Sequence, residues 1–175
     1  MNWRYCNDDL CYTRRKKVLL KLTDEQIQEI LTQTQKPKTG WERVKKGEEY
    51  FKNGETQTWK EEERGESLDS THYEYANYFT SETIAQNILR VQELQRKLWR
   101  RNAELCEKVD WKNPEKIKYC IDYNVDENKL CIIFCLSLNE FGQIYFDTKE
   151  HAEQVMDEFH DELIWYFTQF KSRMD

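Results

Sequence analysis

The sequence predicts an α+β protein made of two repeated βββα modules, with antiparallel strands, a long central helix and an N-terminal strand–helix segment. The first observation is a repeated pattern in residues 77–94 and 144–161. In each stretch the first residue is followed by an aromatic pair, a short polar residue and a helical segment. The second is that strand-like segments with turn signals precede each copy. The third is a helical pattern of nearly 30 residues after the first copy.

Composition limits the class of protein. With 175 residues, 34% charged side chains and six Trp, ten Tyr and eight Phe, the chain is expected to fold as one domain or two small modules. The net charge of −6 disfavours wholesale binding of nucleic acid. The longest apolar run, residues 130–138, is too short to span a membrane, and no signal-peptide pattern is present. We therefore expect a cytoplasmic protein, without a membrane partner.

An N-terminal segment, residues 1–36, precedes the modules. Residues 16–35 predict a strand followed by a short helix, in which Thr23 and Gln26 match a capping box. Pro37 and Gly40 separate this segment from the rest of the chain.

The first module is expected over residues 37–110 and opens at Trp41. A strand around Tyr50 and a second strand, residues 55–62, flank the turn signal Asn53-Gly54. A third strand is predicted within residues 72–79, before the helix. Three strands and a helix then complete one module.

The second module, residues 111–175, follows the same order and opens at Trp111. Its strands are expected around Tyr119, at residues 129–137 and within residues 141–146, with the turn signal at residues 124–128. The two modules thereby predict two sheets that bury one face each against helices.

The helix that ends each module has matching start signals. Ser81 and Thr148 are the expected N-caps, since their hydroxyls can accept from free backbone N–H groups. Glu82 and Glu150 follow in the first turn, where the helix dipole favours negative charge. Alanines at equivalent places, positions 85 and 152, predict close approach of each helix to its sheet.

The first of these helices is expected to run from Ser81 to Val109, about 43 Å at 1.5 Å per residue. Gln95 and Asn102 complete a 4-3 alternation of the kind seen in coiled coils, whereas Leu94 and Trp99 widen the stripe. Internal packing and a homodimer seam are both compatible with this pattern, so monomer and homodimer stay open.

Catalytic and metal motifs are not recognisable. The six cysteines form no CxxC pair, and Cys131 and Cys135 fall on one face of a strand, which favours buried structural thiols. His151 and His160 are nine apart on one helix and do not share a metal. The sequence predicts no enzyme, no metal and no cofactor, although His72 with Asp69 stays open as a catalytic pair.

Two charged surfaces are candidates for binding. An acidic surface suited to a protein partner is expected from two clusters: Glu61, Glu62, Glu63, Asp157, Glu158, Asp161 and Glu162. A basic surface suited to phosphates and stacked bases is expected from the long helix and two tryptophans: Arg96, Lys97, Arg100, Arg101, Trp59 and Trp99.

The strand and helix-entry motifs also carry a resemblance. "GEEYF" after Trp41, then "ANYFTSE" from Ala76, resemble motifs of small uncharacterised proteins encoded by bacteriophages and prophages of Gram-positive bacteria. The likeness continues through "DWKN" and "IYFDTKEHAE" and covers about residues 41–165. Its motifs are structural, and it implies an accessory protein of a mobile element without a known cofactor.

The resemblance leads to the functional hypothesis. We expect a non-enzymatic inhibitor of a bacterial defence system, of the anti-CRISPR kind, that binds a host nuclease complex directly through its acidic surface. The alternative is a nucleic-acid-binding accessory or regulatory protein that uses the basic helix.

Overall fold

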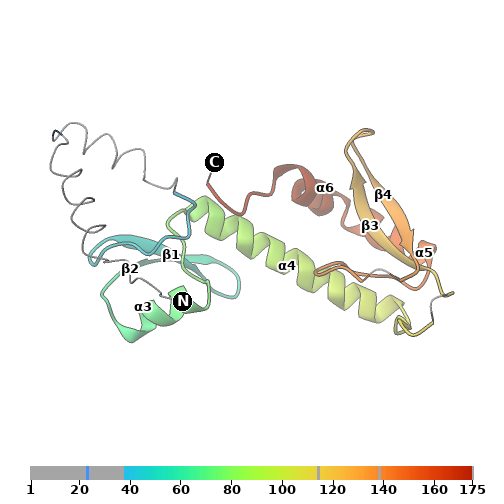
Figure 1. Cartoon of the computed structure of the whole chain (residues 1–175), viewed down its shortest axis with the longest axis horizontal. Helices are drawn as coiled ribbons and strands as arrows, with labels where there is room; N and C mark the ends of the chain where they lie inside the picture. Colours follow the sequence, from blue (N-terminus) through green and yellow to red (C-terminus); the bar gives the residue numbers. More distant parts are fainter. Residues whose placement is uncertain (1–22, 24–37, 114, 138, 175) are drawn as a thin grey trace, which may run out of the picture. The chain divides into compact units, whose positions relative to one another are not determined.

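Figure 1 shows the computed structural model, which describes residues 23, 38–113, 115–137 and 139–174. Apart from Thr23, the predicted N-terminal strand and helix lie outside the described residues. We refer to residues 38–109 as the first half and to residues 110–175 as the second half. The described chain is mixed α and β, as the sequence predicts, with four helices and two antiparallel sheets of two strands each.

The first half contains a hairpin of β1 (Glu49–Asn53) and β2 (Thr58–Glu62), in which Tyr50 lies opposite Glu61. The turn lies where Asn53-Gly54 predicts it, and the Gly54 N–H donates to the carbonyl of Gln57 at 2.9 Å. The hairpin prediction is confirmed.

The third strand predicted within residues 72–79 is wrong. Most of that stretch belongs to helix α3 (Ser67–Glu74) and the turn after it, where Ala76 has a φ of 52°. Buried Asp69 stabilises the start of α3 by accepting the N–H groups of Arg64 (2.9 Å) and Glu66 (3.0 Å). The chain returns to β1 only at Phe79, which exchanges two backbone hydrogen bonds with Phe51 at 2.7 and 2.8 Å.

The second half contains a longer hairpin of β3 (Lys118–Asn124) and β4 (Lys129–Cys135). Its predicted third strand is also wrong, because only Phe146 pairs there, with Tyr119, at 3.0 and 2.7 Å. A turn with Gly142 at a φ of 83° precedes this bridge. Each half therefore has a hairpin and a single bridging residue in place of the predicted three-stranded sheet.

The helix starts are as predicted. Helix α4 (Glu82–Leu105) begins at Ser81, whose Oγ accepts from the N–H of Ile84 at 3.4 Å. Helix α5 (Lys149–Glu158) begins at Thr148, whose Oγ1 accepts from the N–H of His151 at 3.2 Å. The two equivalent alanines, Ala85 and Ala152, are fully buried, which confirms that both helices approach their sheets closely.

Helix α4 ends four residues before the predicted Val109, since Cys106 has extended backbone angles. Its 24 residues span about 36 Å. Ile84, Val91 and Leu94 are buried, and Leu98 and Leu105 pack against the core of the second half. The apolar stripe of α4 is thus used within the chain, the first of the two expected alternatives.

The expected single C-terminal helix is two helices. The backbone leaves helical geometry at Phe159 (φ −112°, ψ 24°), which separates α5 from α6 (His160–Gln169). This break allows α5 to pack on β3 and β4 while α6 packs on β4. Val155 of α5 and Leu163 of α6 are buried there, so both helices contribute to the core.

Two apolar clusters make the core. The smaller lies in the first half and consists of Phe79, Ile84 and Ala85, with Trp41 edge-on to Phe79 at 4.7 Å between ring centroids. The larger lies in the second half and contains the following buried residues: Ile121, Leu130, Phe146, Ala152, Val155 and Leu163.

The end of the chain lies against the first half. The Trp41 Nε1–H donates to the carbonyl of Ser172 at 2.6 Å, and the Met174 N–H donates to the carbonyl of Thr39 at 2.9 Å. Among the described residues, none of the helices has the length and apolar character that a membrane span requires.

Candidate functional site

The predicted acidic surface on β2 is only partly a surface. Glu62 is exposed and Glu61 forms an ion pair with Lys52 at 3.0 Å. Glu63, in contrast, is only 2% exposed, so its assignment to a partner-binding surface is wrong. The physical reason is that an arginine and a tyrosine, 20 residues before it and 15 after it, converge on its carboxylate.

The Glu63 carboxylate accepts from Arg43 Nε (3.1 Å) and Nη2 (3.0 Å), from Tyr78 Oη (2.9 Å) and from the Gly65 N–H (2.9 Å). The hydrogen bonds from Arg43 lower its pKa most, against a rise caused by burial. Charged groups are rarely buried unless they are paired, so this carboxylate is a structural group of the first half, and removal of either partner would leave the other uncompensated.

The four acidic residues predicted at the C-terminus lie together at the junction of α5 and α6. Asp157, Glu158 and Asp161 are exposed and Glu162 is half-buried. Glu158 accepts from Arg101 Nε at 2.7 Å. This cluster and the pair Glu61–Glu62 lie on different halves of the chain.

The predicted basic surface on α4 is largely paired with carboxylates. Lys97 lies 2.7 Å from Glu93, Arg100 lies 3.9 Å from Glu104, and Arg101 contacts both Glu104 (3.1 Å) and Glu158. Of the four basic residues predicted for this surface, Arg96 alone forms no ion pair with a described residue. Trp99 is 55% exposed and shares a helix face with Arg96, three residues before it, whereas Trp59, 50% exposed, lies on β2.

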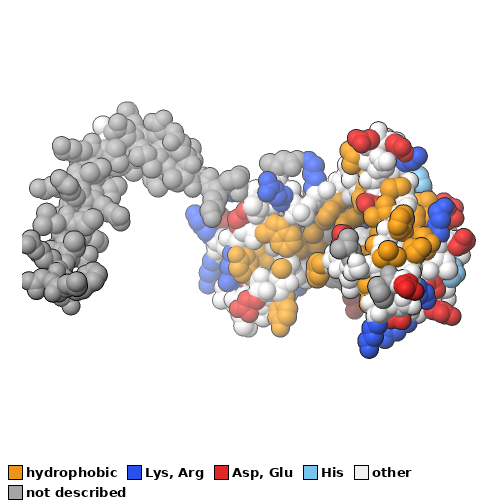
Figure 2. All heavy atoms as spheres, turned by 45° about the vertical axis from the view of Figure 1, so that its right-hand side comes forward, with side chains coloured by type: hydrophobic (Ala, Val, Ile, Leu, Met, Phe, Trp, Pro, Cys, Tyr) orange, Lys and Arg blue, Asp and Glu red, His pale blue; other side chains and the backbone are white. Residues whose placement is uncertain are grey.

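An apolar surface that the sequence analysis did not assign lies along β4. Ile133, Phe134 and Leu136 are 43%, 70% and 46% exposed, and we call these three residues the β4 edge surface. Because neighbouring strand residues point to opposite faces, Ile133 and Phe134 lie on the two faces of the hairpin at this edge. Figure 2 shows apolar side chains gathered on the half of the molecule that contains β3 and β4.

The free edge of β4 also presents backbone groups. Tyr119 directs its backbone N–H and C=O to Phe146. Tyr119 and Phe134, which lie opposite each other in the hairpin, are therefore a non-hydrogen-bonded pair. The backbone groups of Phe134 and, by alternation, of Ile132 and Leu130 therefore point away from β3. In the described residues, no second strand pairs with β4 on that side. A strand edge of this kind is a template for another extended segment.

Charge is distributed unevenly between the two halves of the chain. The second half contains 14 acidic and 7 basic side chains, whereas the first half contains 14 acidic and 13 basic ones. Nearly all of the net negative charge of residues 38–175 therefore belongs to the half that contains β4.

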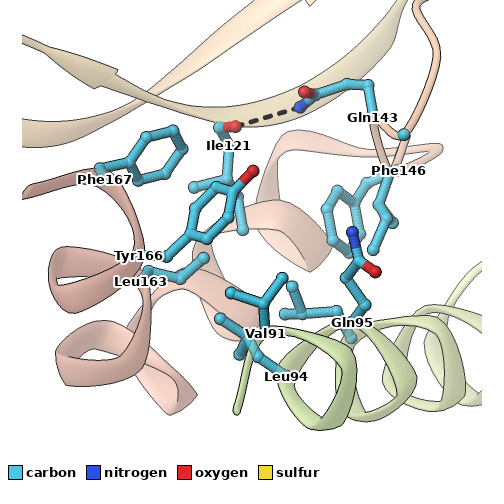
Figure 3. Close-up of a pocket in the computed structure, with 12 residues that line it drawn as sticks. Val91, Leu94, Gln95, Ile121, Gln143, Phe146, Leu163, Tyr166 and Phe167 are labelled. Atoms are coloured by element: carbon cyan, nitrogen blue, oxygen red, sulfur yellow. Dashed lines mark hydrogen bonds between the residues drawn. The ribbon is translucent and has the colours of Figure 1, made fainter. Parts of the chain in front are cut away.

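A cavity of about 140 Å³ lies between α4, β3 and α6. Figure 3 shows Val91 and Leu94 of α4 on one side, with Phe167 and Tyr166 of α6 on another. The Gln143 side chain lines it and donates from Nε2 to the Ile121 carbonyl at 3.1 Å. Its walls are mostly apolar, and its volume resembles that of cavities that hold a benzene-sized molecule.

His72 and Asp69, the catalytic pair left open by the sequence, both meet Tyr50 Oη instead of one another, at 2.9 and 3.0 Å. Burial lowers the pKa of His72 and raises that of Tyr50. Tyr50 also stacks on Tyr78 at 3.9 Å between centroids. The arrangement is a polar core beneath β1.

Cys106, Asp147 and His151 converge between the end of α4 and the start of α5. The His151 Nδ1 lies 2.7 Å from Asp147 Oδ1 and 3.8 Å from Cys106 Sγ. Burial raises the pKa of the Cys106 thiol to about 11. In a nucleophilic relay the thiol and the carboxylate hydrogen-bond to opposite ring nitrogens, and here both approach the same one. This geometry does not activate the thiol as a nucleophile.

The remaining described cysteines fit the structural role expected of them in part. Cys120 is 3% exposed and burial raises its pKa to about 11, while Cys131 and Cys135 are half-buried. None of the four described cysteines forms a disulfide bond with another described cysteine.

Comparison of the chain with protein-family models, with curated proteins and with solved structures finds no match.

Proposed function

We propose that the chain is a non-enzymatic inhibitor that acts by binding another protein, and that it does so through the β4 edge surface. The observation that carries the proposal is the combination of an open strand edge with exposed Ile133, Phe134 and Leu136. An extended segment of the target would pair with the backbone of β4, a common mode of peptide recognition.

The charge of the second half supports a basic partner. Protein interfaces commonly have an apolar centre and a polar rim, and the half of the chain that contains β4 is rich in acidic side chains. Asp157, Glu158 and Asp161 are exposed and retain the role predicted for them, as charges that speed association with a basic surface. Glu63 has no part in this role.

The absence of catalysis is part of the proposal. Two groups of described side chains combine a histidine and an aspartate with a third polar side chain. One is the polar core at Tyr50, and the other is the cluster at Cys106. Neither presents an activated nucleophile, because both partners of the Cys106 cluster approach the same ring nitrogen and burial raises the pKa of Tyr50. The resemblance to phage proteins adds the class of target, a host defence protein such as a nuclease complex that binds nucleic acid.

The test is light scattering after size exclusion, with the full chain, a guide-bound host nuclease and a short duplex DNA. We expect a stable increase in mass with the nuclease and none with the DNA alone. Phe134→Lys should abolish complex formation, because it places a charge at the centre of the apolar edge. Reversal of Asp157 and Glu158 should slow association, with a smaller effect on the amount of complex at equilibrium.

The matched control is Lys60→Ala on β2, which should bind as the unchanged chain does. Complex formation that survives Phe134→Lys would overturn the assignment of the surface. A chain that doubles its own mass through β4 would show that the edge serves a second copy instead.

One observation favours the second candidate, binding of nucleic acid. Arg96 and exposed Trp99 are three residues apart on α4 and share a face, where a phosphate and a stacked base would fit. The carboxylates paired with Lys97, Arg100 and Arg101 weaken that surface, so we rank it second. A mass shift with duplex DNA that disappears in Arg96→Ala would reverse the order.

A further inference from the structure

The cluster of Cys106, Asp147 and His151 combines three different metal-ligating groups. The sulfur, the carboxylate oxygen and the ring nitrogen all lie within 4.8 Å of one another. Cys106 is the residue at which α4 ends, and Asp147 and His151 lie on either side of the N-cap of α5. Sequence spacing did not reveal this group, because 41 residues separate the thiol from the carboxylate.

We propose that Cys106, Asp147 and His151 bind a divalent zinc-like ion that joins the end of α4 to the start of α5. A thiolate, an imidazole and a carboxylate are the ligands that zinc takes in proteins, and three of them leave a fourth position for water. The site is distinct from the β4 edge surface and does not depend on the proposed function.

The distances are close to those that an ion requires. Tetrahedral geometry with ordinary zinc–ligand bond lengths puts sulfur and nitrogen about 3.6 Å apart and nitrogen and oxygen about 3.4 Å apart. The 3.8 Å between Sγ and Nδ1 nearly matches, while the 2.7 Å hydrogen bond from Nδ1 to Oδ1 must open by a fraction of an ångström. The His151 side chain is 31% exposed, so its ring has room to turn.

Neighbouring groups already orient two of the three ligands. The Glu107 N–H donates to Asp147 Oδ2 at 2.9 Å, which leaves Oδ1 for the ion. The Asn102 side chain lies with Nδ2 3.5 Å from Cys106 Sγ and donates to the Tyr145 carbonyl at 2.9 Å. Hydrogen bonds of this kind hold ligands in place and are typical of metal sites.

The test uses Co²⁺ as the probe, with the full chain kept reduced. Binding at this site should produce a thiolate-to-cobalt charge-transfer band in the near ultraviolet, with visible bands of a tetrahedral ion. Zn²⁺ should displace the cobalt and abolish both. Cys106→Ser should remove the charge-transfer band, and His151→Gln should weaken cobalt affinity at least about tenfold, given that changes to orienting neighbours alone cost 10–100-fold.

Two variants serve as controls. Cys131→Ser removes a half-buried thiol on β4, and His160→Ala removes the other histidine that contacts an aspartate, at 3.0 Å from Asp161 but without a cysteine nearby. Both should keep the spectrum and the affinity. Far-ultraviolet circular dichroism establishes that each variant is folded. The proposal is overturned if the unchanged chain gives no charge-transfer band, or if the band persists in Cys106→Ser.

Discussion

The β1–β2 and β3–β4 hairpins are connected to the rest of the chain in the same way, but the side chains on their free edges differ in polarity. In each, one strand bridges to a single phenylalanine ahead of a capped helix, through Phe51 and Phe79 in the first half and through Tyr119 and Phe146 in the second. Across the hairpin from the bridged residue lies Lys60 on β2 and Phe134 on β4. At the same place on the free edge, one hairpin has a charge and the other an exposed aromatic ring.

This difference has a physical meaning. Natural proteins protect exposed strand edges with charges, lysine above all, and β2 follows that rule with Lys60 paired to Glu49 at 2.6 Å. The edge of β4 has only Lys129 at its start and is otherwise apolar. Because one strand edge is protected by a charge and the equivalent edge of β4 is left apolar, we expect the β4 edge to bind a partner. This comparison is the basis of the proposed binding surface.

The largest expected effect concerns the two bridging phenylalanines and tests whether each contributes equally to the stability of the chain. Phe79 and Phe146 are each 1% exposed. Phe79→Ala and Phe146→Ala should each lower the free energy of unfolding by about 3–5 kcal/mol, because each leaves a cavity in its cluster. Urea denaturation measures this, and a loss below about 1 kcal/mol in either variant would mean that the two bridges are not equivalent.

The buried carboxylate of the first half is the next test. Glu63→Gln should lower the free energy of unfolding by about 2–3 kcal/mol, since it leaves Arg43 without its partner in a partly exposed setting. Glu62→Gln, at the exposed neighbouring position, should stay within about 0.5 kcal/mol and serves as the control.

The same residue gives a pH dependence whose sign follows from its lowered pKa. A carboxyl with a folded-state pKa below its unfolded value of about 4.3 contributes stability above that pH and loses it as the pH falls through the folded value. The unchanged chain should therefore lose more stability than Glu63→Gln between neutral pH and pH values below about 4. Parallel stability curves for the two chains would contradict this account of Glu63.

The smallest expected effects concern the helix starts. Ser81→Ala and Thr148→Ala should each cost about 1 kcal/mol, because each removes the hydroxyl that accepts from the third residue of its helix. Thermal unfolding followed by circular dichroism is sufficient to detect this. A neutral result at one cap alone would show that the helix start there depends on packing of the alanine that follows.

The sequence predicted those features that local chemistry determines. The turn at Asn53-Gly54, both N-caps and the two buried alanines depend on neighbours within a few residues, and all are present. The predictions of third strands were wrong because a strand needs a partner along its whole length. In the first half Asp69 stabilises a helix instead, and in the second half the chain turns at Gly142.

The candidate site was predicted less well, for a related reason. In the sequence Glu63 is one of three adjacent acids, and only the fold brings Arg43 and Tyr78 to its carboxylate. In the same way α4 has a basic sequence pattern, but three carboxylates form ion pairs with its charges, those of Glu93, Glu104 and Glu158. The run at residues 130–136 indicated a strand but not which side of it would be left open. An equally apolar strand in the middle of a larger sheet would have the same sequence pattern.

The most direct test of the central claim is amide hydrogen exchange in the full chain, alone and with a guide-bound host nuclease. The account predicts slower exchange of the outward-pointing amides of Ile132 and Phe134 in the complex, with unchanged exchange at Lys60 on β2. Protection confined to β2 or to the exposed face of α4, with β4 unaffected, would contradict it.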